Sequence, residues 1–107
     1  MKLDIDERLV GNWKQKIEDK VVMELGSAAT TLDDLSVVLK ADFGAGEQPS
    51  YVCTVTALSQ SKNPYHVEMR NRYPHVSLAD ALASLRRQVQ RTARFGQQAG
   101  SRIGAVS

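Results

Sequence analysis

The sequence has little of what several classes of protein require. Its 107 residues include one cysteine, Cys53, so neither an internal disulfide nor a cysteine-based zinc site can form within the chain. Three prolines and seven glycines are too few for a fibrous or low-complexity chain. No segment approaches the roughly 20 consecutive apolar residues of a membrane-spanning helix. These absences exclude collagen-like, disulfide-stapled and helical membrane proteins.

The composition that is present is typical of one folded domain. At 42% hydrophobic and 24% charged residues, the chain matches ordinary globular proteins. We expect a single domain over residues 1–95. Residues 96–107 contain too few apolar side chains to pack and are predicted to form a flexible tail. The acidic segment from Met1 to Arg8 does not suit a secretory signal, so we expect a cytoplasmic protein.

Charge is distributed unevenly along the chain. Residues 1–54 carry six basic and ten acidic residues, whereas residues 55–107 carry eight basic and two acidic residues. The net charge therefore changes from −4 in the first half to +6 in the second. Most of the later basic residues are arginines, whose planar guanidinium donates paired hydrogen bonds to phosphate. This pattern indicates a surface for a polyanion, although a solvated helix face has the same composition.

Hydrophobic spacing predicts the order strand, helix, three strands, helix. Ile17 and Val21 belong to an apolar stripe at helical steps, whereas Val37 and Leu39 belong to an alternating, half-buried strand. We therefore expect an edge strand around Leu3 and Ile5, a helix over 7–25, strands over 35–43, 51–58 and 65–72, and a helix from Ser77 to Gly96. Val10 and Trp13 are also expected on the apolar side of the first helix. The aromatic and thiol side chains predicted to lie in the core are Trp13, Phe43, Tyr51, Cys53 and Tyr65.

The last helix has the clearest two-sided pattern. Ser77 and Asp80 have the spacing of a capping box, which predicts a helix beginning at Ser77. Four apolar residues follow at steps of four, three and four and define the buried side. The basic residues fall on the opposite side of the same helix, so they form a stripe. The buried residues are Leu78, Leu82, Leu85 and Val89, and the basic ones are Arg87, Arg91 and Arg94, with Arg86 on the flank.

Two amphipathic helices need a shared apolar surface, and one face of a four-stranded sheet provides it. The predicted fold is therefore α+β, in the order β-α-β-β-β-α, with both helices on one face and the other face open. The short connections predict that the last three strands are antiparallel. A related order occurs in double-stranded RNA-binding domains, which recognise RNA by shape and phosphate contacts.

This order, with the wording of three segments, resembles the short ribosome hibernation-promoting factor and ribosome-associated translation inhibitor family. The similar segments are the opening strand Met1–Asp6, the strand Leu35–Lys40 and the helix centre Leu85–Val89. The family usually has an Asp-x-Tyr motif before the last helix and an aspartate in its first turn, where this chain has Tyr73-Pro-His75 and Ala79. We interpret the chain as a divergent member.

The resemblance implies a cofactor-free α/β domain on the small ribosomal subunit near the decoding region. There it would contact ribosomal RNA, exclude tRNA and messenger, and repress translation under stress. Longer members carry a C-terminal dimerisation domain, so the resemblance to the short type implies a monomer off the ribosome. It implies no membrane and no small-molecule substrate.

We expect the RNA contacts to come from basic residues on the two helices and the last strand. The predicted set is Arg86, Arg87, Arg91, Arg94, Arg70, Arg72, Lys16 and Lys20. Ordinary solvated side chains are the alternative for the two lysines. Tyr73, His66 and His75 are further candidates for contact with bases or phosphates, with a plain surface position as the alternative.

Two other functions are alternatives to RNA binding. A protein-interaction module would use the open sheet face around Val38, Thr54, Thr56 and Arg70. An enzyme would need a convergent polar pocket, and the sequence does not supply one: Cys53 lies in a β-branched segment with no nearby histidine to activate it. The acid pairs Asp33–Asp34 and Asp4–Asp6 could bind a metal, but acid pairs at strand ends are more often solvated caps, so we expect no metal site. No glycine-rich phosphate loop is present.

Overall fold

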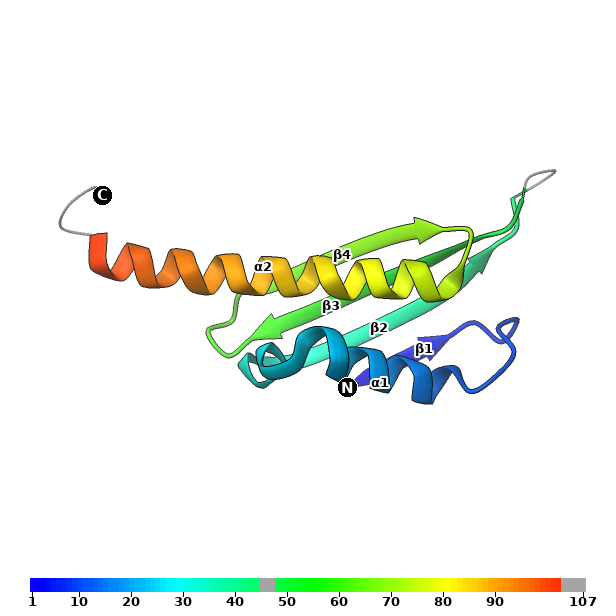
Figure 1. Cartoon of the computed structure of the whole chain (residues 1–107), viewed down its shortest axis with the longest axis horizontal. Coiled ribbons are helices and arrows are strands. Elements are labelled where there is room, and N and C mark those ends of the chain that lie inside the picture. The colour runs from blue at the N-terminus through cyan, green and yellow to red at the C-terminus, as the bar shows by residue number, and fades with distance from the viewer. Residues whose placement is uncertain (45–47, 103–107) are drawn as a thin grey trace.

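Four strands form one mixed sheet, and two helices cover one of its faces (Figure 1). The computed structural model describes the backbone of residues 1–44 and 48–102 and the side chains of residues 1–44 and 48–92. The elements are β1 (Lys2–Ile5), α1 (Trp13–Leu25), the 3-10 helix η1 (Gly26–Thr31), β2 (Leu32–Asp42), β3 (Ser50–Ser59), β4 (Pro64–Asn71) and α2 (Pro74–Arg102).

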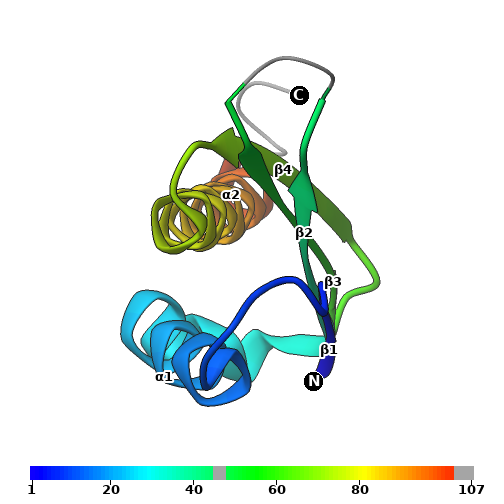
Figure 2. The ribbon, with the colours of Figure 1, turned by 90° about the vertical axis from the view of Figure 1, so that its right-hand side faces the viewer.

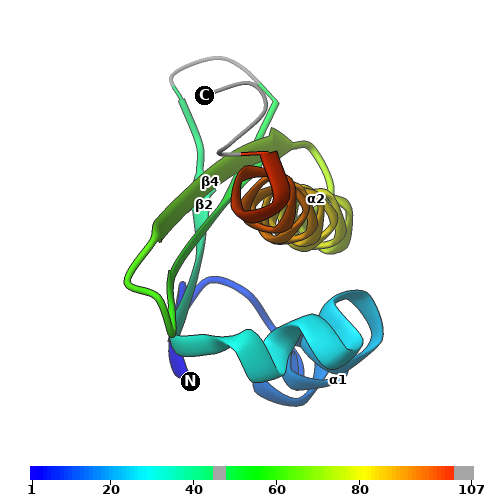
Figure 3. The same ribbon diagram turned by 90° about the vertical axis from the view of Figure 1, so that its left-hand side faces the viewer.

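The strands lie in the order β1-β2-β3-β4, with β1 at one edge. β1 pairs with β2 in parallel, because α1 returns the chain to the end of the sheet at which β1 began. The pairs β2–β3 and β3–β4 are antiparallel. Figures 2 and 3 show both helices on the same side of the sheet. The predicted α+β fold, with an edge strand at the N-terminus and one open face, is confirmed.

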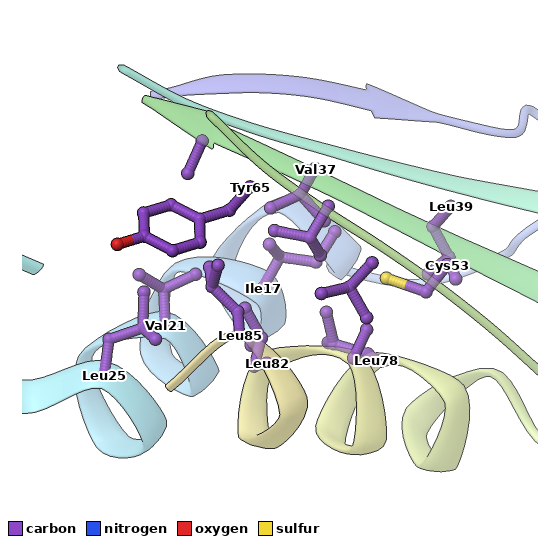
Figure 4. Packing of buried hydrophobic residues seen from close by; sticks show 14 of the residues in the cluster. Ile17, Val21, Leu25, Val37, Leu39, Cys53, Tyr65, Leu78, Leu82 and Leu85 are labelled. Atoms are coloured by element: carbon purple, nitrogen blue, oxygen red, sulfur yellow. The ribbon is translucent and has the colours of Figure 1, made fainter. Parts of the chain in front are cut away.

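The core lies between the sheet and the two helices (Figure 4). Both predicted apolar stripes are buried, and they meet the inward side chains of the central strands. The tyrosine and thiol predictions for Tyr65 and Cys53 are confirmed, as is that for Trp13. The stripes and their sheet partners are Trp13, Ile17, Val21 and Leu25 on α1, Leu78, Leu82, Leu85 and Val89 on α2, and Val37, Leu39, Cys53, Val55, Tyr65 and Val67 on the strands.

The prediction that the first helix begins at Glu7 is wrong. α1 begins at Trp13, and the side chain of Val10, which was predicted to belong to the apolar stripe, is 89% exposed. Two features keep the preceding residues out of the helix. The Asp6 carboxylate accepts a hydrogen bond from the backbone N–H of Arg8, which fixes a turn there. Gly11 has a φ of +115°, a value that no α-helix accepts.

Both predicted ends of the second helix are wrong. α2 begins at Pro74, where the fixed φ of proline suits a first helical position. Ser77 is fully buried and its hydroxyl donates to the carbonyl of Pro74, so it does not form a capping box. The helix also continues past Gly96 to Arg102, because an interior glycine costs only about 1 kcal/mol and does not itself end a helix. The predicted tail therefore overlaps the helix, and residues 103–107 lie outside the described residues.

The aromatic residues near the β2–β3 connection are less buried than predicted. Phe43 lies just beyond the end of β2 and is 48% exposed, and Tyr51 is half-buried. The buried positions of β2 end at Ala41, and Figure 1 shows this hairpin extending beyond the part of the sheet that α2 covers. The apolar residues of β2 and β3 continue to alternate beyond the part of the sheet that the helices cover, so the last of them are not buried.

Candidate nucleic-acid interface

The outward side of α2 presents arginines to solvent. Leu82, Leu85 and Val89 fix which side of the helix faces the sheet, because all three are buried. Arg87 and Arg91 lie opposite them and are exposed, and Arg86 lies on the flank and is half-buried. The predicted stripe is therefore present at these three positions. Arg94 lies on the same helix, but its side chain is outside the described residues.

These arginines have no carboxylate partner among the side chains that the structure describes. Four ion pairs form there, between Arg8 and Asp6, Lys40 and Asp4, Lys62 and Asp33, and Arg70 and Asp42. None of the four involves an arginine of α2. An external anion can therefore bind the guanidinium groups of Arg86, Arg87 and Arg91 without breaking an ion pair within this part of the chain.

The lysines of α1 extend this charge toward the gap between the helices. Lys14 and Glu18 lie on the flank of α1 that faces β1, because they line one surface hollow with Met1, Leu3 and Ile5. At about 100° per residue, Lys16 and Lys20 lie on the opposite flank, which faces α2. The Lys16 ammonium lies 4.7 Å from the centroid of the Trp13 ring, which holds it near the helix surface.

Arg86 faces the same inter-helix side from α2. The two helices run in the same direction along one face of the sheet (Figure 1). Residues at the same angle from the buried stripe of each helix therefore point in the same direction across the sheet. Arg86 is rotated about the axis of α2, away from the buried stripe, in the same direction as Lys14 is about the axis of α1. Lys14 faces β1, so Arg86 also faces the β1 side of the sheet. Since α1 lies on that side of α2, Arg86 faces α1. The fold thus joins the charges of both helices on one side of the molecule. We call this set, Lys16, Lys20, Arg86, Arg87 and Arg91, the helical basic surface.

The fold does not bring Arg70 to this surface. Arg70 lies on β4 and faces away from the helices, where one guanidinium nitrogen donates to Asp42 Oδ2 and to Ser50 Oγ, each at 2.7 Å. Arg72 is exposed in the short connection between β4 and α2. His66 is exposed on the open face of β4, opposite Thr56.

The open face of the sheet is the surface that a protein-interaction module would use. Val38 and Thr54 are half-buried neighbours in register there, and Thr56 is exposed. Two ion pairs lie on this face, between Lys40 and Asp4 at 3.1 Å and between Arg70 and Asp42 at 2.7 Å. Glu68, opposite Thr54, adds a negative charge, so this face does not share the positive charge of the helical basic surface.

A buried aspartate that the sequence analysis did not single out organises the end of β1. Asp6 is 7% exposed, and its carboxylate accepts hydrogen bonds from Arg8 and from the backbone N–H of Ala41 at 2.8 Å. These hydrogen bonds hold the pKa of Asp6 well below its usual range. The Arg8 guanidinium also donates to the Ala41 carbonyl and lies 4.9 Å from the centroid of the Phe43 ring. Asp6 thus joins the end of β1 to β2.

The Asp6 contacts predict an acid-sensitive fold. The folded-state pKa of Asp6 lies below its unfolded value, so the stability that Asp6 contributes is complete above about pH 4 and is lost as the pH falls through the lowered folded-state value. We expect Asp6→Asn to lower the melting temperature at pH 7 by about 5 °C or more and to flatten its decline below about pH 4. Thermal denaturation followed by circular dichroism measures both.

Asp4→Asn is the matched control for this prediction, because the exposed pair of Asp4 and Lys40 is solvent-screened. Its melting curve should follow that of the wild type at every pH. An Asp6→Asn variant that melts with the wild type from neutral to acid pH would show that the carboxylate does not stabilise the fold.

The remaining chemical groups offer little for catalysis. Burial raises the pKa of the Cys53 thiol to about 12, so it stays protonated and is a poor nucleophile. Across residues 1–44 and 48–92, no three acidic, histidine or cysteine side chains lie close enough to hold a metal ion together. Neither helix, over the part that the structure describes, has the length and hydropathy to cross a bilayer.

Several solved structures share this fold. A ribosomal subunit interface protein from Coxiella burnetii matches with a TM-score of 0.66 over 88% of this chain and 99% of its own, at 4% sequence identity. The N-terminal domain of Protein Y from Thermus thermophilus matches with a TM-score of 0.58 over 86% of this chain and 99% of its own, at 17% identity. No protein-family model matches the sequence, and no curated protein matches it significantly.

Both of these solved structures are of the hibernation-promoting-factor family, the family that the sequence resembles. At identities of 4% and 17%, the likeness establishes a shared fold. The architecture that the resemblance implied is therefore confirmed, and its elements cover nearly all of each solved chain.

Proposed function

We propose that this protein is a divergent, non-enzymatic ribosome hibernation factor that binds the small ribosomal subunit and represses translation. The observation that carries the proposal is the outward side of α2, where Arg87 and Arg91 are exposed and unpaired among the described side chains. Unpaired guanidinium groups on a rigid helix suit the phosphates of structured RNA. The shared fold with a ribosomal subunit interface protein supports the ribosome as the source of that RNA.

The proposed mechanism is electrostatic and steric. The helical basic surface replaces counterions on ribosomal RNA, and the release of those counterions drives binding. The bound domain then occupies space near the decoding region that tRNA and messenger need. The mechanism requires no cofactor and no bond-making step, and we propose that a cytoplasmic monomer performs it. We include Arg94 in the helical basic surface because it follows Arg87 and Arg91 at helical spacing in the sequence.

Co-sedimentation with purified small ribosomal subunits tests the proposal. The protein should pellet with the subunits at low salt and dissociate as salt is raised, and excess protein should lower messenger-directed translation in a purified system. Recovery of the protein with a ribosome-free partner after nuclease treatment, with no binding to subunits, would instead favour the open sheet face as an interaction surface.

A further inference from the structure

An aromatic ring stands exposed at the junction between β4 and α2. The side chain of Tyr73 is 53% exposed, which is unusual for a ring with so much apolar surface. The ring of His75 lies beside it, with the centroids 5.9 Å apart and the ring planes at 39°. We call these two rings the Tyr73–His75 platform. Nothing in the fold requires either ring for the core, which is complete without them.

The backbone that carries the Tyr73–His75 platform is fixed on both sides. The N–H of Tyr73 donates to Asn71 Oδ1 at 3.0 Å. The carbonyl of Tyr73 accepts hydrogen bonds from the N–H groups of Val76 and Ser77, both at 3.1 Å, and Pro74 restricts the chain between them. Tyr73 is thus held by its main chain while its ring faces water. A ligand that stacks on it need not order the loop first, which lowers the entropic cost of binding.

The Tyr73–His75 platform continues the helical basic surface. His75 lies on the same flank of α2 as Arg86, eleven positions earlier, which corresponds to a rise of about 16 Å along the helix. Arg72 is exposed directly before the tyrosine and joins no ion pair among the described side chains. An RNA backbone that followed the Arg86 flank of α2 would reach the two rings within a few nucleotides.

The other large exposed ring at this end of the molecule is engaged by its own neighbours. Phe43 has the Arg8 guanidinium 4.9 Å from its centroid and packs against the edge of Tyr51, with the centroids 6.3 Å apart. Among the described side chains, the Tyr73 ring has one aromatic neighbour, His75, and no cation lies over it. This contrast makes Tyr73 the ring available to an outside partner.

We propose that the Tyr73–His75 platform stacks on an unpaired base of the RNA whose phosphates the helical basic surface holds. The inference rests on the proposed function and extends it to the form of RNA preferred: helical RNA next to an unpaired nucleotide. Aromatic rings accept any base, because every base has a π face, so the preference is for an unstacked nucleotide and not for a sequence.

The test compares two RNA probes, a short hairpin and the same hairpin with an unpaired extension that contains a fluorescent adenine analogue. The wild type should bind the extended hairpin more tightly and change the fluorescence of the analogue. Tyr73→Leu should weaken binding to the extended hairpin by roughly 5- to 150-fold and abolish the fluorescence change. It should bind the plain hairpin as the wild type does. Tyr73→Phe keeps the ring and should behave as the wild type.

Phe43→Leu is the matched control, because it removes an exposed ring of similar size at the same end of the molecule. It should leave both affinities unchanged, and melting curves establish that each variant is folded. If Tyr73→Leu binds the extended hairpin like the wild type, or loses affinity equally for both probes, the platform is overturned while the proposed function stands. If the wild type binds neither probe nor ribosomal subunits, the proposed function fails and the platform fails with it.

Discussion

Replacing Arg87 and Arg91 by glutamate is expected to lower affinity for the small ribosomal subunit by more than about 100-fold. A hydrogen bond to a charged group contributes about 1.5–3 kcal/mol, so two lost guanidinium contacts reach this factor before repulsion is considered. The glutamates add repulsion, because each faces the phosphate that its predecessor contacted. Quantitative co-sedimentation with purified subunits measures the change.

The double variant should remain folded, because both side chains are exposed and lie opposite the buried stripe of α2. Its control is Lys2→Glu with Lys62→Glu, which changes the net charge equally. Lys2 lies on the edge strand β1, and Lys62 lies in the β3–β4 turn, where it pairs with Asp33. The control should lose at most a few-fold in affinity. Equal losses in both variants would show that net charge, and not the α2 surface, determines binding.

Salt should weaken the wild-type complex steeply. If the helical basic surface neutralises about five phosphates, the logarithm of the affinity falls against the logarithm of the salt concentration with a slope of about −4. Affinity then drops roughly 100- to 500-fold between about 50 mM and about 200 mM salt. A salt series of the same co-sedimentation experiment gives the slope.

The slope should also respond to the variant in a defined way. Loss of two phosphate contacts in the Arg87→Glu and Arg91→Glu double variant makes the slope shallower by about 1.5. A wild-type affinity that hardly changes with salt would mean that phosphate contacts do not hold the complex. Protein–protein contacts on the ribosome would then be the remaining explanation.

The parts of the fold that the sequence predicted are those governed by local periodicity. The stripe of Leu78, Leu82 and Leu85 determines one side of α2, so the opposite placement of Arg87 and Arg91 follows from helix geometry alone. The strand order and the single helical layer follow from short connections and two amphipathic helices. The prediction of the architecture depends on many apolar residues that recur at helical or strand spacing, so one atypical residue does not change it.

The parts that the sequence did not predict depend on partners distant along the chain. Asp6 belongs to the alternating pattern of the first strand as an outward residue, yet it is buried because Ala41 and Arg8 donate to it. Alternation along the strand places Arg70 on the open face, but it does not show that Asp42 and Ser50, which are distant in sequence, accept hydrogen bonds from its guanidinium there. The sequence shows that these side chains are charged, but only the tertiary structure shows which of them form ion pairs or hydrogen bonds.

Directed hydroxyl-radical probing determines whether the helical side of the domain faces ribosomal RNA, as we propose. Cys53 is buried and its raised pKa keeps it unreactive, so an iron chelate will attach to an introduced cysteine. Asp80→Cys places the chelate on the outer side of α2, and Thr56→Cys places it on the open sheet face, where both positions are exposed. With small subunits, we expect strong cleavage of ribosomal RNA from position 80 and weak cleavage from position 56. The reverse pattern would contradict the proposed orientation of the domain on the ribosome.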